Sequence, residues 1–493
     1  MTRFSFRSSL PLVVGFAACY SPNEPIGGDG TDDGSTGATI GTETSNTVGS
    51  ATVATTAPTN TTDVTSATET DATDATDATQ GTDATDSVDT SAGSTDEGGA
   101  LCGNAQMDDG EACDDGDEIN GNGCNNDCVE SGTVLWDLGY GDSEDPGTGA
   151  GATDIGVNVD GVVVVTGATG SGGWIGTFTV DGMEVEQPVV LPGVQLSALD
   201  FFSGGDLAIG YFDAMGVSVR RMTTAGDIVW STTALDTGGV LGSGGRGIDV
   251  DEDDNIVAVG AISESIYGGD IWTGEFDDAG FQGWSDVLDN VQPVAGFGRD
   301  VACAPDGECV AAGRIDGNGG PTAGGHYGWF RRFSPAGVTI WTRTFDEPSG
   351  SFDVGCVAVD VAGNALVIGT AASDIWVRKY EPGGDVEWTV TYDDPNSDDD
   401  WGDGCAADPD GNVIAVGWEM RDDLAQQRNA WIAKYDGEGT LLWMTTHNGV
   451  DNVDDAAVAV ATDDAGRIYV AGRVDYDNLD GGAVKLWIRA LAP

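Results

Sequence analysis

Acidic and aromatic residues are interleaved in several loop-like segments in the C-terminal region of this 493-residue chain. Carboxylates bind hydroxyl groups and cations, and aromatic rings offer flat faces to sugar rings or cationic groups. The combination predicts a surface that recognises a protein or a glycan, directly or through bridging calcium. The alternative is that these are solvated loops of an acidic protein. The candidate ligand-binding residues are Trp401, Trp418, Tyr327, Tyr476, Asp400 and Asp403.

Two short acidic runs place oxygen donors at close intervals, and oxygen is the donor that calcium prefers. The second run lacks the central glycine and the trailing glutamate of a typical calcium loop, and it coincides with a turn between two strands. Calcium sites and simple solvated turns are therefore the two alternatives. The candidate calcium ligands are Asp114, Asp115 and Asp117 in the first run, and Asp249, Asp251 and Asp253 in the second.

The common catalytic patterns are absent from the sequence. The two histidines, His326 and His447, are far apart and have no nucleophile motif beside them. No HExxH or GxSxG motif occurs, and acidic pairs are too numerous to single out a catalytic pair. The sequence therefore indicates a protein that is not an enzyme. The alternative is a carbohydrate hydrolase or lyase that uses loop carboxylates as catalysts.

The N-terminus has the pattern of an export signal over residues 1–18. Two arginines precede an apolar stretch at 10–18, which is too short to span a bilayer. The sequence FAAC that ends at Cys19 resembles a bacterial lipobox. The resemblance implies that Cys19 carries a lipid that anchors the protein at the outer membrane or cell surface, facing the periplasm or the exterior. The alternative is ordinary signal cleavage and secretion.

Two small segments follow the signal. Residues 19–100 are rich in Thr, Asp, Ser and Ala and contain no Lys or Arg, so we expect a disordered linker. Residues 101–130 form an acidic module with too few apolar residues for a core, so two disulfides or a metal must stabilise it. Its CDDG and NGNGC elements resemble the myxobacterial cysteine-rich repeat of bacterial surface proteins. The module's cysteines are Cys102, Cys113, Cys124 and Cys128.

Residues 131–493 contain seven copies of one repeat. Each copy has an inner strand, a strand that ends in glycine, a strand usually headed by tryptophan, and a strand that usually bears another tryptophan. Period-2 alternation with Gly/Asp turns predicts four antiparallel strands per copy. The glycines are Gly167, Gly210, Gly260, Gly313, Gly369, Gly417 and Gly472.

One four-stranded sheet cannot bury its own faces, so the copies must stack on one another. A closed ring buries the faces of all seven sheets. The region opens with a lone tryptophan strand at 133–138 and ends without one. We therefore expect an all-β, seven-bladed β-propeller whose last blade is completed by the N-terminal strand. The repeat also resembles those of propellers in bacterial secreted and surface lipoproteins.

Four further cysteines lie in the repeats. Cys303 and Cys309 flank one hairpin turn, so they could pair. Cys356 and Cys405 fall on the inner strands of consecutive repeats and either join two blades or remain free thiols. With an acylated Cys19 set aside, an even number of cysteines suits an oxidising compartment.

Loop length indicates which end of the ring binds a ligand. The turns between the first and second strands, and between the third and fourth, are short and regular. The other two sets of loops vary, and strand order places both at the same end. The candidate ligand-binding residues lie in or beside these variable loops.

Net charge excludes some partners. The chain carries −64 at pH 7, with 83 Asp+Glu against 19 Lys+Arg. Such a polyanion cannot hold nucleic acid or an anionic lipid surface by releasing counterions. We therefore expect an envelope or extracellular protein or glycan as partner, and membrane contact only through the lipid.

Overall fold

The computed structural model describes residues 105, 107, 111–116, 120–121, 123–140, 151–169, 172–213, 216–236, 245–265, 268–288, 296–316, 326–346, 352–395, 399–449, 452–476 and 485–493. The predicted signal 1–18, the predicted linker 19–100, Cys19, Cys102 and Asp117 lie outside the described residues. The described residues belong to one compact unit, Ala92–Pro493. None of their helices is long and apolar enough to span a membrane.

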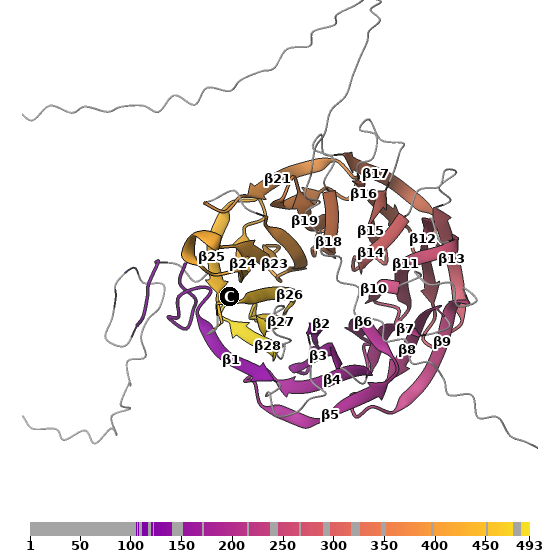
Figure 1. Ribbon diagram of the computed structural model, residues 1–493, viewed down its shortest axis with the longest axis horizontal. Helices are drawn as coiled ribbons and strands as arrows, with labels where there is room; N and C mark the ends of the chain where they lie inside the picture. Colours follow the sequence, from indigo (N-terminus) through magenta and orange to yellow (C-terminus); the bar gives the residue numbers. More distant parts are fainter. Residues whose placement is uncertain are drawn as a thin grey trace, which may run out of the picture. The chain divides into compact units, whose positions relative to one another are not determined.

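Seven four-stranded antiparallel sheets, or blades, form a ring (Figure 1), which confirms the predicted seven-bladed β-propeller. Blade 1 contains β2 (Ala152–Val157), β3 (Val162–Thr169), β4 (Gly172–Thr179) and β5 (Glu184–Pro192). Blade 2 contains β6 (Gln195–Phe201), β7 (Leu207–Asp213), β8 (Gly216–Met222) and β9 (Ile228–Asp236). Blade 3 contains β10 (Gly245–Val250), β11 (Ile256–Ser265), β12 (Gly268–Phe276) and β13 (Gln282–Leu288).

The remaining blades follow the same order from the centre outwards (Figure 1). Blade 4 contains β14 (Gly296–Cys303), β15 (Cys309–Asp316), β16 (His326–Phe333) and β17 (Thr339–Asp346). Blade 5 contains β18 (Phe352–Val359), β19 (Ala365–Ala371), β20 (Asp374–Tyr380) and β21 (Val386–Tyr392). Blade 6 contains β22 (Trp401–Ala407), β23 (Val413–Met420), β24 (Arg428–Tyr435) and β25 (Leu441–His447).

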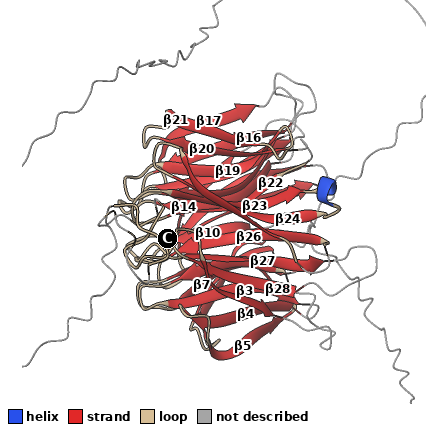
Figure 2. Cartoon of the chain, turned by 90° about the vertical axis from the view of Figure 1, so that its left-hand side faces the viewer, coloured by secondary structure: helices blue, strands red, loops and turns tan. Residues whose placement is uncertain are grey.

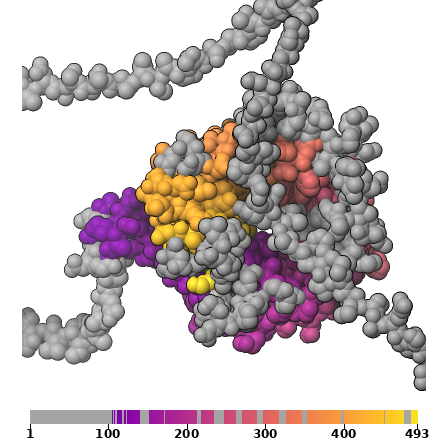
Figure 3. Space-filling model, in the orientation of Figure 1, coloured from indigo at the N-terminus to yellow at the C-terminus, as the bar shows by residue number. Residues whose placement is uncertain are grey.

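Blade 7 joins the two ends of the propeller. It contains β26 (Asp454–Thr462), β27 (Ile468–Tyr476) and β28 (Lys485–Leu491), and β1 (Val134–Tyr140) pairs with β28 as its outer strand. The indole of Trp487 and the guanidinium of Arg489 both donate to Asp137 on β1, at 2.6 and 2.7 Å. In the space-filling view, purple residues near the start of the described chain lie beside the orange and yellow C-terminal residues (Figure 3). The predicted closure is confirmed.

The second strands continue past the recurring glycine, and in blades 4 to 7 this glycine is explained by a close approach of the inner strand. A Cβ atom at Gly417 would lie 1.9 Å from the carbonyl oxygen of Trp401, and one at Gly472 would lie 2.0 Å from that of Ala456. No larger residue fits this contact, so glycine marks the pairing of the inner two strands.

The regular hairpin turns gather at one end of the ring, which we call the turn face; the end with the variable loops is the loop face. In Figure 2 the tan turns lie along the left side, and the 3-10 helix η1 (Asp422–Leu424) lies on the right. In one such turn, Asp360 Oδ1 accepts from the backbone N–H groups of Ala362 and Asn364, and its Oδ2 accepts from the Asn364 side chain, at 2.8–2.9 Å. Asp251 and Asp408 form the same turn, so this carboxylate is structural.

Disulfides are present, as predicted. Cys113 pairs with Cys124 in the N-terminal module, and Cys128 is also disulfide-bonded. In the propeller, Cys303 pairs with Cys309 across the hairpin turn of blade 4, and Cys356 pairs with Cys405 between blades 5 and 6. The structure thus resolves the alternative of free thiols in favour of a covalent link between two blades.

Candidate binding site at the channel mouth

A β-bulge interrupts every inner strand and turns one side chain towards the central channel. The register shifts between the first two strands in all seven blades, for example between Gly298 and Asp300 and between Gly402 and Gly404. Inner-strand residues from all seven blades line a cavity of about 480 Å³. Bulge residues on this cavity are Thr153, Ser197, Arg299, Gly355, Asp403 and Val458.

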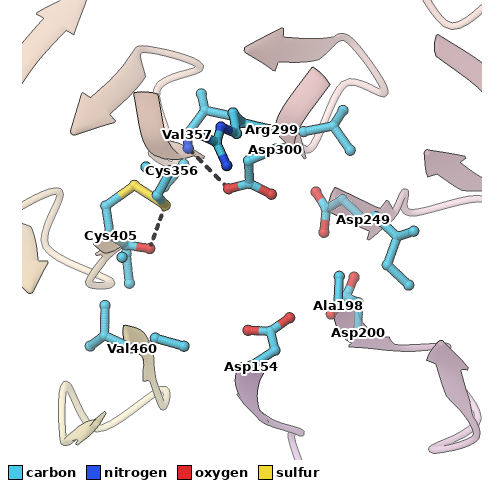
Figure 4. A pocket seen from close by; sticks show the side chains of 18 of the residues that line it. Asp154, Ala198, Asp200, Asp249, Arg299, Asp300, Cys356, Val357, Cys405 and Val460 are labelled. Atoms are coloured by element: carbon cyan, nitrogen blue, oxygen red, sulfur yellow. Dashed lines mark hydrogen bonds between the residues drawn. A yellow bond between two sulfur atoms is a disulfide. The ribbon is translucent and has the colours of Figure 1, made fainter. Parts of the chain in front are cut away.

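Four carboxylates from consecutive blades face the channel (Figure 4): Asp154, Asp200, Asp249 and Asp300. Each accepts a hydrogen bond from a backbone N–H of the next blade's inner strand. The accepting oxygens lie 2.8, 2.7, 2.5 and 3.0 Å from the donor nitrogens, which belong to Leu199, Val250, Cys303 and Val357. These carboxylates therefore connect blades 1 to 5 in sequence.

Burial makes these channel carboxylates weaker acids than an exposed aspartate. It raises the pKa of Asp154 to about 8 and that of Asp300 to about 7, although backbone N–H donors oppose the shift. Burial also raises the pKa of Asp200 and of Asp249, which are hydrogen-bonded to each other. The ring therefore holds protons at neutral pH.

The connection between blades 5 and 6 is covalent instead. In the strand register, Cys356 lies opposite Ile368, the residue before the glycine of blade 5. Asp154 and Asp300 occupy the equivalent inner-strand position in blades 1 and 4. The disulfide from Cys356 to Cys405 replaces the carboxylate–amide hydrogen bond found there (Figure 4). The two cysteines differ by one residue in register, since Cys356 lies opposite Ile368, one residue before Gly369, and Cys405 lies opposite Ala415, two residues before Gly417.

Asp403 lies nearer the loop face, on the bulge of blade 6. Burial raises its pKa to about 7, while Arg473, Arg299 and Arg428 favour its ionised form and Asp353 opposes it. Among the described residues, no hydrogen bond or ion pair holds this carboxylate. Asp403 is therefore a carboxylate that can accept a bond from a ligand.

Two predicted tryptophans lie on β22 and β23, towards the loop-face ends of the strand that holds Asp403 and of its partner strand. Trp401 and Trp418 are partners across β22 and β23, with parallel rings whose centroids are 6.5 Å apart. The guanidinium of Arg428 lies over Trp418, 4.1 Å from the ring centroid. Trp418 is buried and Trp401 is half-buried, so Trp401 is the ring that remains accessible to a ligand.

Arginines on blade 4 complete the mouth. Arg299 Nη2 and Arg314 Nη1 both donate to Asp353 Oδ2, at 2.6 and 2.9 Å, and Asp353 is buried. Arg314 also pairs with Asp316, which lies 2.6 Å from His326 Nδ1. We define the channel mouth as these arginines with Asp353, Asp403, Trp401, Trp418 and Arg428.

The other predicted ligand-face residues lie apart from this site or are not accessible. Asp400 is fully buried, and its carboxylate accepts from the backbone N–H groups of Asp394 and Met420 at 2.9 and 3.2 Å. Burial raises its pKa to about 7. Tyr327 packs at the core between blades 3 and 4, and the side chain of Tyr476 lies outside the described part of the chain.

Asp117 lies outside the described residues, and among the described calcium candidates no three have their carboxylate oxygens within 4.8 Å of one another. Asp249 faces the channel, whereas Asp251 bonds to its own turn and Asp253 is exposed. Asp114 Oδ1 accepts from the backbone N–H groups of Ala105 and Gly116, and Asp115 Oδ2 accepts from that of Cys124. Within the described ranges, one other acidic group has its oxygens within 4.8 Å of one another: Asp393, Asp394 and Asp400.

Sequence reasoning missed most of the charged residues at the channel and its mouth. The sequence does not single out the channel aspartates, because each repeat carries many acidic residues. These aspartates are Asp154, Asp200 and Asp300, and the arginines missed are Arg299 and Arg428. A usable signal was present: a lone charge stands in an inner strand that otherwise holds small and apolar residues, as Asp154 does in ATDIGV. Only the bulge shows that such a side chain faces the channel.

No protein-family model matches the chain, and no curated protein matches it. Solved structures with a similar fold include a streptogramin B lyase, at 14% identity over 72% of this chain and 97% of that one, with a TM-score of 0.48. A catalytically inactive virginiamycin B lyase from Staphylococcus aureus with quinupristin matches at 13% identity over 72% and 99%, with a TM-score of 0.49. A gluconolactonase from Xanthomonas campestris matches at 16% identity over 60% and 85%, with a TM-score of 0.35.

Proposed function

We propose that this propeller is a surface-displayed binding protein that recognises a glycan at the channel mouth. The observation that carries the proposal is that a half-buried ring, Trp401, lies on the same inner strand, two residues before Asp403, a carboxylate with no hydrogen bond or ion pair among the described residues. An aromatic face stacks on a sugar ring, and a carboxylate accepts from its hydroxyl groups. The regular turn face offers no comparable pairing, because its turn carboxylates are occupied.

Anchoring is part of the proposal. A lipid on Cys19 and the linker 19–100 would display the propeller away from the outer membrane, with the 101–130 module, of the myxobacterial type, between them. Labelled fatty acid is expected to enter the wild type but not Cys19→Ser. Label in both proteins would contradict the anchor and leave secretion as the alternative.

A glycan array tests the binding proposal, with and without calcium. Trp401→Ala is expected to weaken binding of the best glycan at least tenfold. The matched control is Trp284→Ala, which removes an outer-strand tryptophan on blade 3 that is distant from the mouth. Equal loss in both variants would contradict a site at the mouth, and binding of a protein from envelope extracts without any glycan would favour a scaffold role.

A second candidate function is a carbohydrate hydrolase or lyase. It is favoured by carboxylates whose pKa lies near neutrality, since a general acid or base works best when its pKa is close to the working pH. Turnover assays on the glycans that bind would decide. Turnover that Asp403→Asn or Asp300→Asn abolishes would replace the binding proposal with the enzyme.

A further inference from the structure

Three acidic side chains meet on the loop face, where blade 5 is joined to blade 6. They are Asp393 and Asp394, which follow β21, and Asp400, which precedes β22. One oxygen from each carboxylate lies within 4.8 Å of the others. Asp394 is 3% exposed and Asp400 is fully buried, whereas Asp393 is exposed. Two of the three carboxylates are therefore held out of water, and the third lies beside them at the surface.

Backbone contacts fix the position of Asp400 in this group. Its Oδ2 accepts from the backbone N–H of Asp394 at 2.9 Å, and its Oδ1 accepts from that of Met420 at 3.2 Å. Each carboxylate oxygen has a second lone pair, so both can still bind a cation. Burial, with the charges of Asp394 and Glu419 in addition, raises the pKa of Asp400 to about 7. Negative charge is therefore costly at this point, and a cation would reduce the cost.

A fourth carboxylate lies next to the group. Glu419 is 1% exposed, and its Oε2 accepts from the hydroxyl of Tyr392, the residue directly before Asp393. Its Oε1 pairs with Arg421 at 3.2 Å. Arg421 also pairs with Asp423 at 2.9 Å, so one guanidinium is shared between two carboxylates at the edge of the group.

A buried amide on the same face is an independent sign of a ligand. Asn429 on β24 is 4% exposed; its Nδ2 donates to Gln426 at 2.9 Å, but its Oδ1 has no hydrogen-bond partner. Asn429 is the cross-strand partner of Glu419, so both side chains lie on one face of blade 6. Trp431, two residues along β24, lies on that face as well, and its ring centroid is 5.1 Å from that of Tyr392. The amide oxygen therefore lies on the face of blade 6 that the end of β21 covers, and a buried acceptor without a donor is explained by a bound ion.

We propose that the three aspartates and the Asn429 amide oxygen hold a calcium ion at the junction of blades 5 and 6. Carboxylate and amide oxygens are the donors that calcium prefers, and water or backbone carbonyls complete its about six to eight ligands. These four donors include no thiolate or imidazole, which disfavours zinc and copper. Magnesium demands a smaller and nearly octahedral arrangement, so it is expected to bind more weakly.

The ion links two blades. Asp393 and Asp394 follow the outer strand of blade 5, whereas Asn429 belongs to the third strand of blade 6. Asp400 directly precedes Trp401, so a bond from the ion to Asp400 also fixes the start of β22. Calcium is therefore expected to raise the melting temperature of the propeller. Calcium binding here does not depend on a glycan.

Calorimetry with calcium chloride on the full chain, after bound metal has been removed with a chelator, tests the site. Asp394→Asn and Asp400→Asn should each weaken calcium binding at least tenfold. Asn429→Leu removes an oxygen donor and should weaken it several-fold. Asn429→Asp keeps the donor and adds charge, so it should bind calcium at least as tightly as the wild type. Magnesium chloride should bind to the wild type at least tenfold more weakly than calcium chloride.

The matched control is Asp422→Asn, which removes an exposed carboxylate of η1 and should leave the calcium affinity unchanged. Melting temperatures without calcium show whether each variant folds. If the aspartate variants do not fold, the two Asn429 variants and the magnesium comparison still decide. The site is wrong if the wild type binds no calcium, or if Asp394→Asn and Asp400→Asn bind it as the wild type does. Loss of calcium binding in Asn429→Asp would also contradict it.

Discussion

The two faces of the ring use charge in different ways. On the turn face, a cation of the third strand pairs with a carboxylate of the first turn in blade after blade, as with Lys379 and Asp360 or Lys434 and Asp408. On the loop face, charges such as Arg299 and Asp403 differ from one blade to the next. Repeated pairing stabilises the fold, whereas irregular and incompletely paired charge suits recognition.

The largest effect is expected from removing a disulfide, and the channel disulfide can be compared with the one on the turn face. Removing Cys356–Cys405 as a double alanine variant should lower the free energy of unfolding by about 4 kcal/mol, because that bond closes a 49-residue separation. Removing Cys303–Cys309 should cost about 2 kcal/mol, because it closes a separation of 6 residues. Denaturant unfolding measures both. A larger loss for the shorter separation would show that native-state strain outweighs chain entropy.

Breaking a turn-face ion pair should be nearly as costly. Lys434 and Asp408 are 1% and 2% exposed, so Lys434→Ala leaves a buried carboxylate without its cation and should cost about 3 kcal/mol. The module is close to this lysine, since a Cβ atom at Gly121 would lie 2.2 Å from its Nζ. A loss below about 1 kcal/mol would mean that water reaches Asp408.

The channel should make stability depend on pH in the direction opposite to ordinary acid denaturation. The pKa of Asp154 is about 8 in the folded protein, above the usual value of 3.8, so the folded state binds the proton more tightly than the unfolded state does. The free energy of unfolding should therefore fall as the pH rises from about 5 to about 8.5, by roughly 1 kcal/mol or more.

Asp154→Asn removes the titrating carboxyl group and should flatten the decrease in the free energy of unfolding with pH. The variant should equal the wild type at pH 5 and exceed it at pH 8.5, measured as melting temperature. If the variant is instead less stable at pH 8.5, the charged hydrogen bond to Leu199 outweighs the cost of burying the carboxylate.

The smallest effect is expected on the exposed rim. Arg343 is 38% exposed, and its carboxylate partner Asp385, at 3.8 Å, is 86% exposed. Arg343→Ala should change the free energy of unfolding by less than about 0.5 kcal/mol. A larger change would place this arginine among the structural pairs through its contacts with the Gly383 and Gly384 carbonyls.

The sequence by itself determined the ring. Alternating apolar residues, Gly/Asp turns and the recurring glycine each record a local requirement, such as the close approach at Gly417, which recurs in blades 4 to 7. The lone strand at the start of the repeats was enough to predict closure through β1. The pairing of Cys303 with Cys309 also followed from a single hairpin.

The tertiary structure decided the site. Which residue of an inner strand faces the channel depends on a bulge that shifts the register by one, and nothing in the local pattern fixes that shift. Asp249 and Asp251 illustrate the consequence: they are two residues apart, yet one faces the channel and the other closes a turn. Arg299, Asp353 and Asp403 come from blades 4, 5 and 6, so only the stacking of these blades brings them together.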